Sequence, residues 1–257
     1  MRTNIGTIEL NYLVNGEADL PWLVFSNSVA TDLTMWNEQV EQLKNRFQIL
    51  RYDQRGHGLS DAPTGRYSID MHAEDLINLL DTLGIQRASL VGISIGGMTV
   101  LTMAKKHPER VDKLVVCDCG PTSNPRAAQQ WMERIEKVSA GGMDSIVEET
   151  IERWFTKETL AKDSPILNRV AAMIRNTPVS GFTGSAYALT KFDLLPGLER
   201  LPVPTLFIAG EHDAVVDGTR ILSEKAPNSR FVTIPRAGHL CNLENSEDFL
   251  SVLTEFL

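Results

Sequence analysis

The chain has 257 residues, of which 42% are hydrophobic, which is enough to bury the core of one domain with an insertion. Acidic residues outnumber basic residues by 33 to 25, and the net charge of −8 argues against nucleic acid or an anionic membrane as a partner. Because no apolar leader and no long apolar run is present, we expect a cytoplasmic protein that does not enter a membrane. The three cysteines lack the spacing of a metal site or a disulfide framework and are expected to be buried thiols: Cys117, Cys119 and Cys241.

The first third of the chain alternates strand patterns with helix patterns. Apolar residues alternate over 7–15 and run together over 22–25 and 47–50, which predicts three strands. A helical pattern follows the second of these strands. Another helix is expected after the third, with Ser68 as its N-cap and an end near Gly84.

Two polar loops follow these strands. The first, 26–29, ends a strand at the carboxyl edge of the sheet, where a backbone N–H can stabilise an oxyanion. We predict the N–H of Val29 as this donor, with Ser28 as the next choice. In the second loop, Asp53 and Arg55 are expected to hold a glycine-rich turn together and not to catalyse.

A strand pattern over 88–91 leads directly into a helical pattern through a Gly-x-Ser-x-Gly motif. Gly92 and Gly96 flank Ser94 where a side chain would collide with the backbone of a tight strand-to-helix turn. Such a turn presents the serine hydroxyl at the carboxyl edge of the sheet and at a helix N-terminus. We therefore predict Ser94 as a nucleophile and the N–H of the next residue, Ile95, as an oxyanion donor.

Strand, loop and helix patterns keep repeating through the buried strand 114–117, which predicts a mostly parallel sheet with helices on both faces, an α/β fold. From residue 121 to 196 the strand patterns disappear and amphipathic helical patterns replace them. We therefore predict a core made of 1–120 and 197–257, with 121–196 as an inserted helical cap.

Two further strands, over 204–209 and 230–234, each lead to a catalytic candidate. Asp213 follows the first strand and His239 follows the second, so the chain order is serine, aspartate, histidine. A serine hydroxyl needs a base within hydrogen-bond reach and a third group that orients the base. We predict that Ser94 attacks, that His239 transfers the proton, and that Asp213 orients His239.

Other residues compete for these roles. Asp118 also ends a core strand and is the alternative acid. The remaining histidines are given no catalytic role. His57 is expected in a turn or pocket floor and His212 in loop packing, whereas His72 and His107 are expected at the surface.

Several segments together resemble the 3-oxoadipate enol-lactonase family of the alpha/beta-hydrolase superfamily. Many superfamily members share the Gly-x-Ser-x-Gly turn, called the nucleophile elbow, and the triad of serine, aspartate and histidine. Two other features are more discriminating: Ser-Asn-Ser in place of the commoner His-Gly, and the ending His-Leu-x-Asn-x-Glu. The chain departs from the family at Val29-Ala30, where Leu-Gly is usual. The segments that carry the resemblance are 26–36, 50–58, 92–97, 209–215 and 238–244.

The resemblance implies an alpha/beta-hydrolase fold and hydrolysis of a small enol-lactone that carries a carboxylate, through an acyl-enzyme and without a metal or organic cofactor. The carboxylate needs a cationic partner, and Arg134 or Arg153 of the cap is suitable. A solvated helix face is the alternative interpretation of either arginine. The candidate substrate-binding residues are Ser28, Trp131, Arg134 and Trp154.

Two other functions fit the same residues. One is a carboxylesterase or carbon–carbon bond hydrolase that acts on another small ester or ketone. The other is a hydrolase-like ligand receptor that keeps the triad but signals through a partner surface. If the protein is an enzyme of either kind, an enol-lactonase or one of these other hydrolases, the expected partner is a small-molecule substrate.

Overall fold

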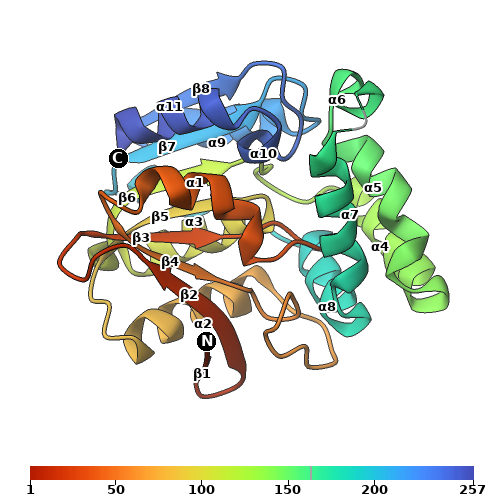
Figure 1. Ribbon diagram of the computed structural model, residues 1–257, viewed down its shortest axis with the longest axis horizontal. Coiled ribbons are helices and arrows are strands. Elements are labelled where there is room, and N and C mark those ends of the chain that lie inside the picture. The colour runs from red at the N-terminus through yellow and green to blue at the C-terminus, as the bar shows by residue number, and fades with distance from the viewer. Residues whose placement is uncertain (163) are drawn as a thin grey trace.

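A computed structural model of the protein describes residues 1–162 and 164–257. Within these residues the strands form one sheet in the order β1-β2-β4-β3-β5-β6-β7-β8 (Figure 1). Strand β2 is antiparallel to β1 and β4, and the other neighbouring strands are parallel. The strands are β1 (Arg2–Asn4), β2 (Glu9–Asn15), β3 (Trp22–Ser26), β4 (Gln48–Tyr52), β5 (Ala88–Ile93), β6 (Val111–Cys117), β7 (Thr205–Gly210) and β8 (Ser229–Ile234).

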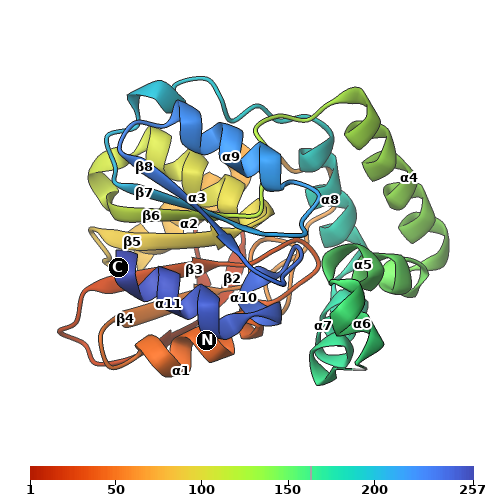
Figure 2. The ribbon, with the colours of Figure 1, turned by 90° about the horizontal axis from the view of Figure 1, so that it is seen from above.

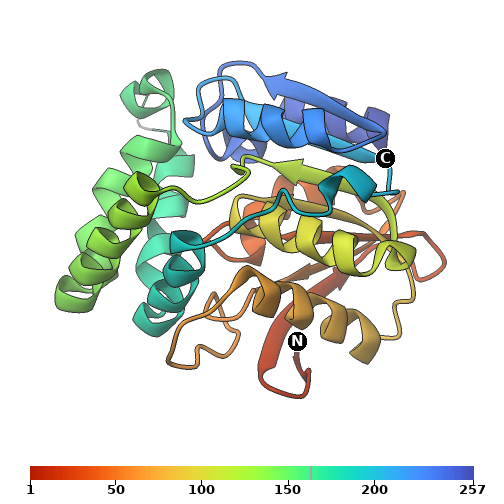
Figure 3. The same cartoon turned by 180° about the vertical axis from the view of Figure 1, so that it is seen from behind.

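Helices cover both faces of the sheet, as the sequence predicts. Figure 2 shows α2 (Ile69–Thr82), α3 (Ile95–Lys106) and α9 (Val216–Lys225) on one face, with α1 (Asn37–Leu43) and α11 (Ser246–Phe256) on the other. Figure 3 shows the first group from the front. Short helical elements join these layers: η1 (Leu33–Trp36), η2 (Pro108–Arg110), η4 (Leu198–Arg200) and α10 (Cys241–Glu244).

A separate group of helices stands at the carboxyl ends of the parallel strands, between β6 and β7 in the sequence (Figure 1). Among its described residues β-structure is limited to an isolated bridge between Thr122 and Asp193. We use the name cap for residues 121–196. Its helices are α4 (Pro125–Gly141), η3 (Met143–Ile146), α5 (Val147–Trp154), α6 (Lys157–Ala161), α7 (Pro165–Asn176) and α8 (Val179–Thr190).

Burial explains why the apolar runs in the sequence predicted the strands correctly. Every residue of β5 and of β7 is buried, because neighbouring strands pair on both sides and helices cover both faces. The predicted helix after Ser68 is confirmed, and the Ser68 hydroxyl caps it by accepting from the Met71 N–H at 3.2 Å. Strand β1 was not predicted. Its three polar residues are held by pairing with β2.

The glycine-rich turn after β4 supports the cap. Asp53 accepts hydrogen bonds from the N–H groups of Leu33 and Leu59, and Arg55 pairs with Asp75 of α2, so both residues have the structural role predicted for them. In the same turn, the backbone of Gly56 lies against that of Gly181 in α8. A Cβ added to Gly181 would lie 1.9 Å from the Gly56 oxygen. The cap is therefore seated on the core at a contact that admits no side chain.

None of the helices in the described residues is both long enough and apolar enough to cross a bilayer. The three cysteines are free and buried, as the sequence predicts. The prediction of a surface position for His72 is wrong. This residue is 1% exposed, on the face of α2 that packs into the core, and its Nε2 lies 3.4 Å from the Ser185 hydroxyl of the cap.

Candidate active site

Ser94 lies between the end of β5 and the first residue of α3, in the strand-to-helix turn that the motif predicts. Its backbone has φ 57° and ψ −122°, a strained conformation for a residue with a side chain, and its N–H donates to the Cys117 oxygen at 2.8 Å. A Cβ added to Gly92 would lie 2.2 Å from the Gly96 oxygen, and one added to Gly96 would lie 2.3 Å from the Ser26 oxygen. Both glycines are therefore required by close backbone contacts.

His239 and Asp213 meet in front of this turn, although 26 residues separate them. The His239 Nδ1 lies 2.9 Å from the Asp213 Oδ2, in loops that follow β8 and β7. Both residues and Ser94 line one cavity of about 270 Å³. Within the described residues the Ser94 hydroxyl makes no hydrogen bond to His239. The arrangement leaves the other imidazole nitrogen for proton transfer, once a substrate draws the hydroxyl and the ring together.

Asp118 lines the same cavity but does not hydrogen bond to His239. Its Oδ1 accepts from the Gly210 N–H at 2.8 Å, and its Oδ2 accepts from the Cys241 thiol at 2.9 Å. This geometry favours Asp213 over Asp118 as the group that orients His239.

The two buried carboxyl groups hold different charges. Burial, with the charge of Asp213, raises the pKa of Asp118 well above its ordinary value. Burial also acts to raise the pKa of Asp213, but the charge of His239 and its hydrogen bond outweigh this effect and leave that pKa below its ordinary value. Burial therefore disfavours the charged form of Asp118, whereas the contact with His239 favours the charged form of Asp213.

Ile95 and Val29 are the predicted oxyanion donors; Ile95 follows Ser94 in the sequence, and Val29 lines the same cavity as Ser94. Ile95 is the first residue of α3, so its N–H has no carbonyl partner within the helix. Val29 lines the cavity, and no hydrogen bond in the described residues uses its N–H. The Ser28 N–H instead points to the Met35 sulfur at 3.4 Å. Ser28 is not among the cavity-lining residues, so the predicted substrate contact of Ser28 has no support in this geometry.

The loop that carries Val29 is held firmly. The Asn27 amide donates to the Thr31 oxygen at 2.8 Å, and the Gln54 amide donates to the Asn27 oxygen at 2.5 Å. Ala30 has φ 56°, a conformation that glycine adopts more easily. Ala30 therefore carries backbone strain that a glycine at this position would not have.

The cap supplies two tryptophans and two arginines to the cavity: Trp131, Arg134, Arg153 and Trp154. The solvated-face interpretation is wrong for Arg134, which is 9% exposed. Its guanidinium carbon lies 5.2 Å from the centre of the Trp131 ring, and its Nη2 donates to the Thr150 hydroxyl at 2.6 Å. The Nε of Arg134 is buried without a partner, whereas Arg153 is exposed. Burial lowers the pKa of Arg134 to about 10, so the guanidinium remains charged at neutral pH.

Sequence reasoning missed most of the apolar wall of this cavity. These residues belong to no motif, and some of them are only half-buried. They include Met98, Ala127, Leu189 and Phe192.

The other histidines lie away from Ser94. His57 is fully buried in its turn, where its Nδ1 lies 2.9 Å from the Arg55 oxygen, and burial lowers its pKa to about 4. It is not among the residues that line the cavity. His212 was expected in loop packing, but its side chain is 59% exposed.

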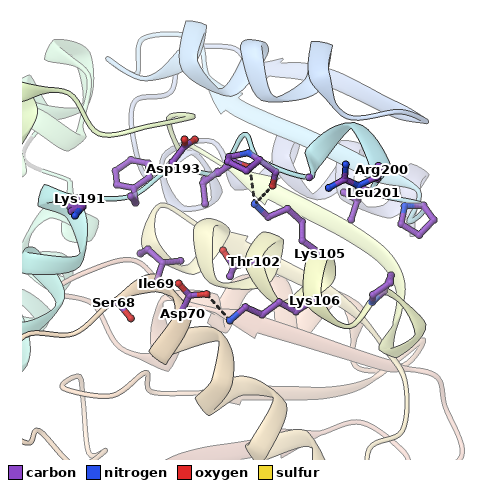
Figure 4. A pocket seen from close by; sticks show the side chains of 16 residues that line it. Ser68, Ile69, Asp70, Thr102, Lys105, Lys106, Lys191, Asp193, Arg200 and Leu201 are labelled. Atoms are coloured by element: carbon purple, nitrogen blue, oxygen red, sulfur yellow. Dashed lines mark hydrogen bonds and ion pairs between the residues drawn. The ribbon is translucent and has the colours of Figure 1, made fainter.

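A hollow of about 450 Å³ lies away from these residues, between α2, α3 and the chain that returns from the cap (Figure 4). Two of its cations, Lys105 and Lys106, already have partners. The Lys105 ammonium donates to the oxygens of Leu194 and Pro196 at 2.8 and 3.2 Å, and Lys106 lies 2.6 Å from Asp70. Lys105 therefore joins the returning chain to α3, Lys106 joins α3 to α2, and the catalytic candidates lie elsewhere.

Comparison with known proteins agrees with this geometry. A family model described as the alpha/beta hydrolase fold matches residues 21–246. The chain belongs to this family. It is 34% identical to 3-oxoadipate enol-lactonase 2 of Acinetobacter baylyi, over 94% of this chain and 90% of the relative. The solved enol-lactonase from Burkholderia xenovorans has a TM-score of 0.95 and 32% identity, over 100% of this chain and 99% of the other.

These relatives confirm the predicted alpha/beta-hydrolase fold and the resemblance to enol-lactonases. The family also contains other hydrolases. The chain is 30% identical to a putative carbamate hydrolase, RutD, of Stutzerimonas stutzeri, over 96% of each chain. Membership therefore indicates hydrolysis, and the choice of substrate depends on the cavity.

Proposed function

We propose that the protein hydrolyses 3-oxoadipate enol-lactone, or a close carboxylate-bearing enol-lactone, to the open 3-oxo diacid during the breakdown of aromatic compounds. The observation that carries the proposal is Arg134, a buried cation in the same cavity of about 270 Å³ as Ser94 and His239. The Arg134 Nη1 lies 3.6 Å from the Glu149 carboxylate, and its Nε has no hydrogen-bond partner. A buried guanidinium of this kind suits a small anionic substrate. The enol-lactonase relatives support the same substrate class.

The reaction begins with attack of the Ser94 hydroxyl oxygen on the lactone carbonyl, while His239 takes the hydroxyl proton. Asp213 stabilises the imidazolium that forms, and the N–H groups of Val29 and Ile95 bind the oxyanion. The ring C–O bond breaks, the enolate oxygen leaves, and His239 returns the proton to it. The enol becomes the ketone. Water activated by His239 then releases the diacid from Ser94.

Purified protein assayed with the enol-lactone and with p-nitrophenyl acetate tests this proposal. We expect rapid lactone turnover and weak ester turnover, since the acetate has no carboxylate for Arg134 to bind. Faster turnover of simple esters would instead indicate a carboxylesterase. Tight lactone binding without turnover would indicate a receptor.

Replacing Arg134 with glutamine is expected to raise the KM for the lactone by about ten- to a hundredfold, the value of a charged hydrogen bond. The KM for p-nitrophenyl acetate should stay within about threefold of wild type. Steady-state kinetics on both substrates measure the difference. Arg153→Gln is the matched control, because this arginine lines the same cavity but is exposed. A larger KM increase in the Arg153 variant would make the exposed arginine the anchor.

A further inference from the structure

Two segments far apart in the sequence meet at the catalytic histidine candidate. The His239 N–H donates to the Trp154 oxygen, at the end of α5, at 2.8 Å. The two rings are stacked, with centres 5.9 Å apart and planes inclined by 28°. A Cβ added to Gly238 would lie 2.5 Å from the Trp154 oxygen, so the loop and the cap touch through their backbones. The position of His239 therefore depends on this part of the cap.

The Glu244 carboxylate bridges the same two segments. Its Oε1 accepts from the N–H and the hydroxyl of Thr156, at 2.8 and 2.6 Å. Its Oε2 accepts from the Gly238 N–H at 2.6 Å. Three donors from two separate segments thus meet one side chain, and all three belong to residues within two positions of Trp154 or His239.

We propose that Glu244 is a positioning residue for His239, whose carboxylate fixes the catalytic loop to the cap. Only a carboxylate offers an acceptor oxygen on both sides. A carboxamide would turn an N–H toward Thr156 or Gly238, both of which are donors. The cap near Trp154 also cannot move away without removing the acceptor of the His239 N–H. This part of the cap therefore stays fixed to the core while substrate enters.

The test uses a fluorophosphonate probe, which requires an activated serine but no particular substrate. The Ser94 oxygen bonds to phosphorus, fluoride leaves, and His239 takes the hydroxyl proton. The inference rests on Ser94 and His239 as nucleophile and base, but not on the lactone. We expect Glu244→Gln to lower the maximal labelling rate about tenfold to a hundredfold, as misplacement of a reacting group by a fraction of an ångström does. The concentration giving half-maximal rate should stay within about threefold.

Glu247→Gln is the matched control, since this exposed glutamate lies three residues farther along and takes no part in the bridge. It should label at the wild-type rate. If the probe fails to label the wild-type protein, the assignment of the nucleophile and the base is overturned together with this inference. If the probe labels the wild type and the Glu244→Gln variant at the same rate, the inference alone is overturned.

Formate separates positioning from general stability. Glu244 lines a small hollow of about 210 Å³ that also contains Thr156, so truncation to alanine leaves an accessible space for a small carboxylate. We expect added formate to restore part of the labelling rate of Glu244→Ala but not that of Glu244→Gln, whose amide still fills the site. If the labelling rate and the thermal midpoint of Glu244→Ala both fall, and formate does not restore the rate, Glu244 has only a structural role.

Discussion

Replacement of Ser94 by alanine is expected to lower kcat for the enol-lactone by about four to six orders of magnitude. Without the hydroxyl no acyl-enzyme forms, and only substrate binding and the oxyanion donors remain. The fold should survive, because alanine keeps the Cβ and therefore keeps the strain that Ser94 already has at φ 57°. Steady-state kinetics give the rate, and thermal unfolding tests the fold.

His239→Ala should produce a loss of similar size, because a serine hydroxyl without its base is a weak nucleophile. The double variant should be little worse than either single variant, since the two groups act as one unit. Ser89→Ala is the control. Ser89 is a buried serine of β5 that does not line the cavity. Near wild-type turnover in either Ser94→Ala or His239→Ala would refute the mechanism.

The elbow was predictable from the sequence because its requirements are local. Gly92 and Gly96 are needed by contacts within a few residues and with one adjacent strand, and such contacts leave a short motif. The pairing of Asp213 with His239 was predictable for a different reason. Parallel strands bring their carboxyl ends to one edge, so chain order alone places the two loops together.

Residues of the cap were harder to interpret, because their surroundings depend on how helices pack. Arg134 lies on a charged amphipathic helix, and only the packing of α4 on α8 turns its side chain inward, beside Phe182. For His72 the sequence does indicate burial. This residue follows Ile69 by three residues and precedes Leu76 by four, the spacing of a buried helix face. This spacing predicts a buried position for His72, and it is better evidence than the general tendency of histidines to be exposed.

Chain order favours Asp213 over Asp118 as the orienting acid, although both carboxyl groups follow core strands. Replacing each with asparagine distinguishes them in solution. In Asp213→Asn the amide removes the charge that stabilises the imidazolium and holds His239 in the wrong tautomer, so kcat should fall about 10⁴-fold. Steady-state kinetics measure the loss.

Asp118→Asn should leave kcat within about tenfold of wild type, because burial disfavours the charged form of Asp118 and an amide carries no charge. The amide oxygen can still accept from Gly210, and its N–H can donate toward Asp213. A greater loss of kcat here than in Asp213→Asn would make Asp118 the orienting acid.

The pH dependence of stability tests independently whether the pKa of Asp118 is raised in the folded protein. A group whose pKa is raised in the folded state keeps a proton that the unfolded chain releases, so the wild-type free energy of unfolding falls as pH rises from the ordinary aspartate pKa to the raised one. Asp118→Asn removes this slope. Its stability relative to wild type should therefore increase as the pH rises above the ordinary aspartate pKa, which urea unfolding over a pH series measures. A constant difference across this pH series would mean that Asp118 is ionised in the folded protein, and that two buried carboxylates lie beside His239.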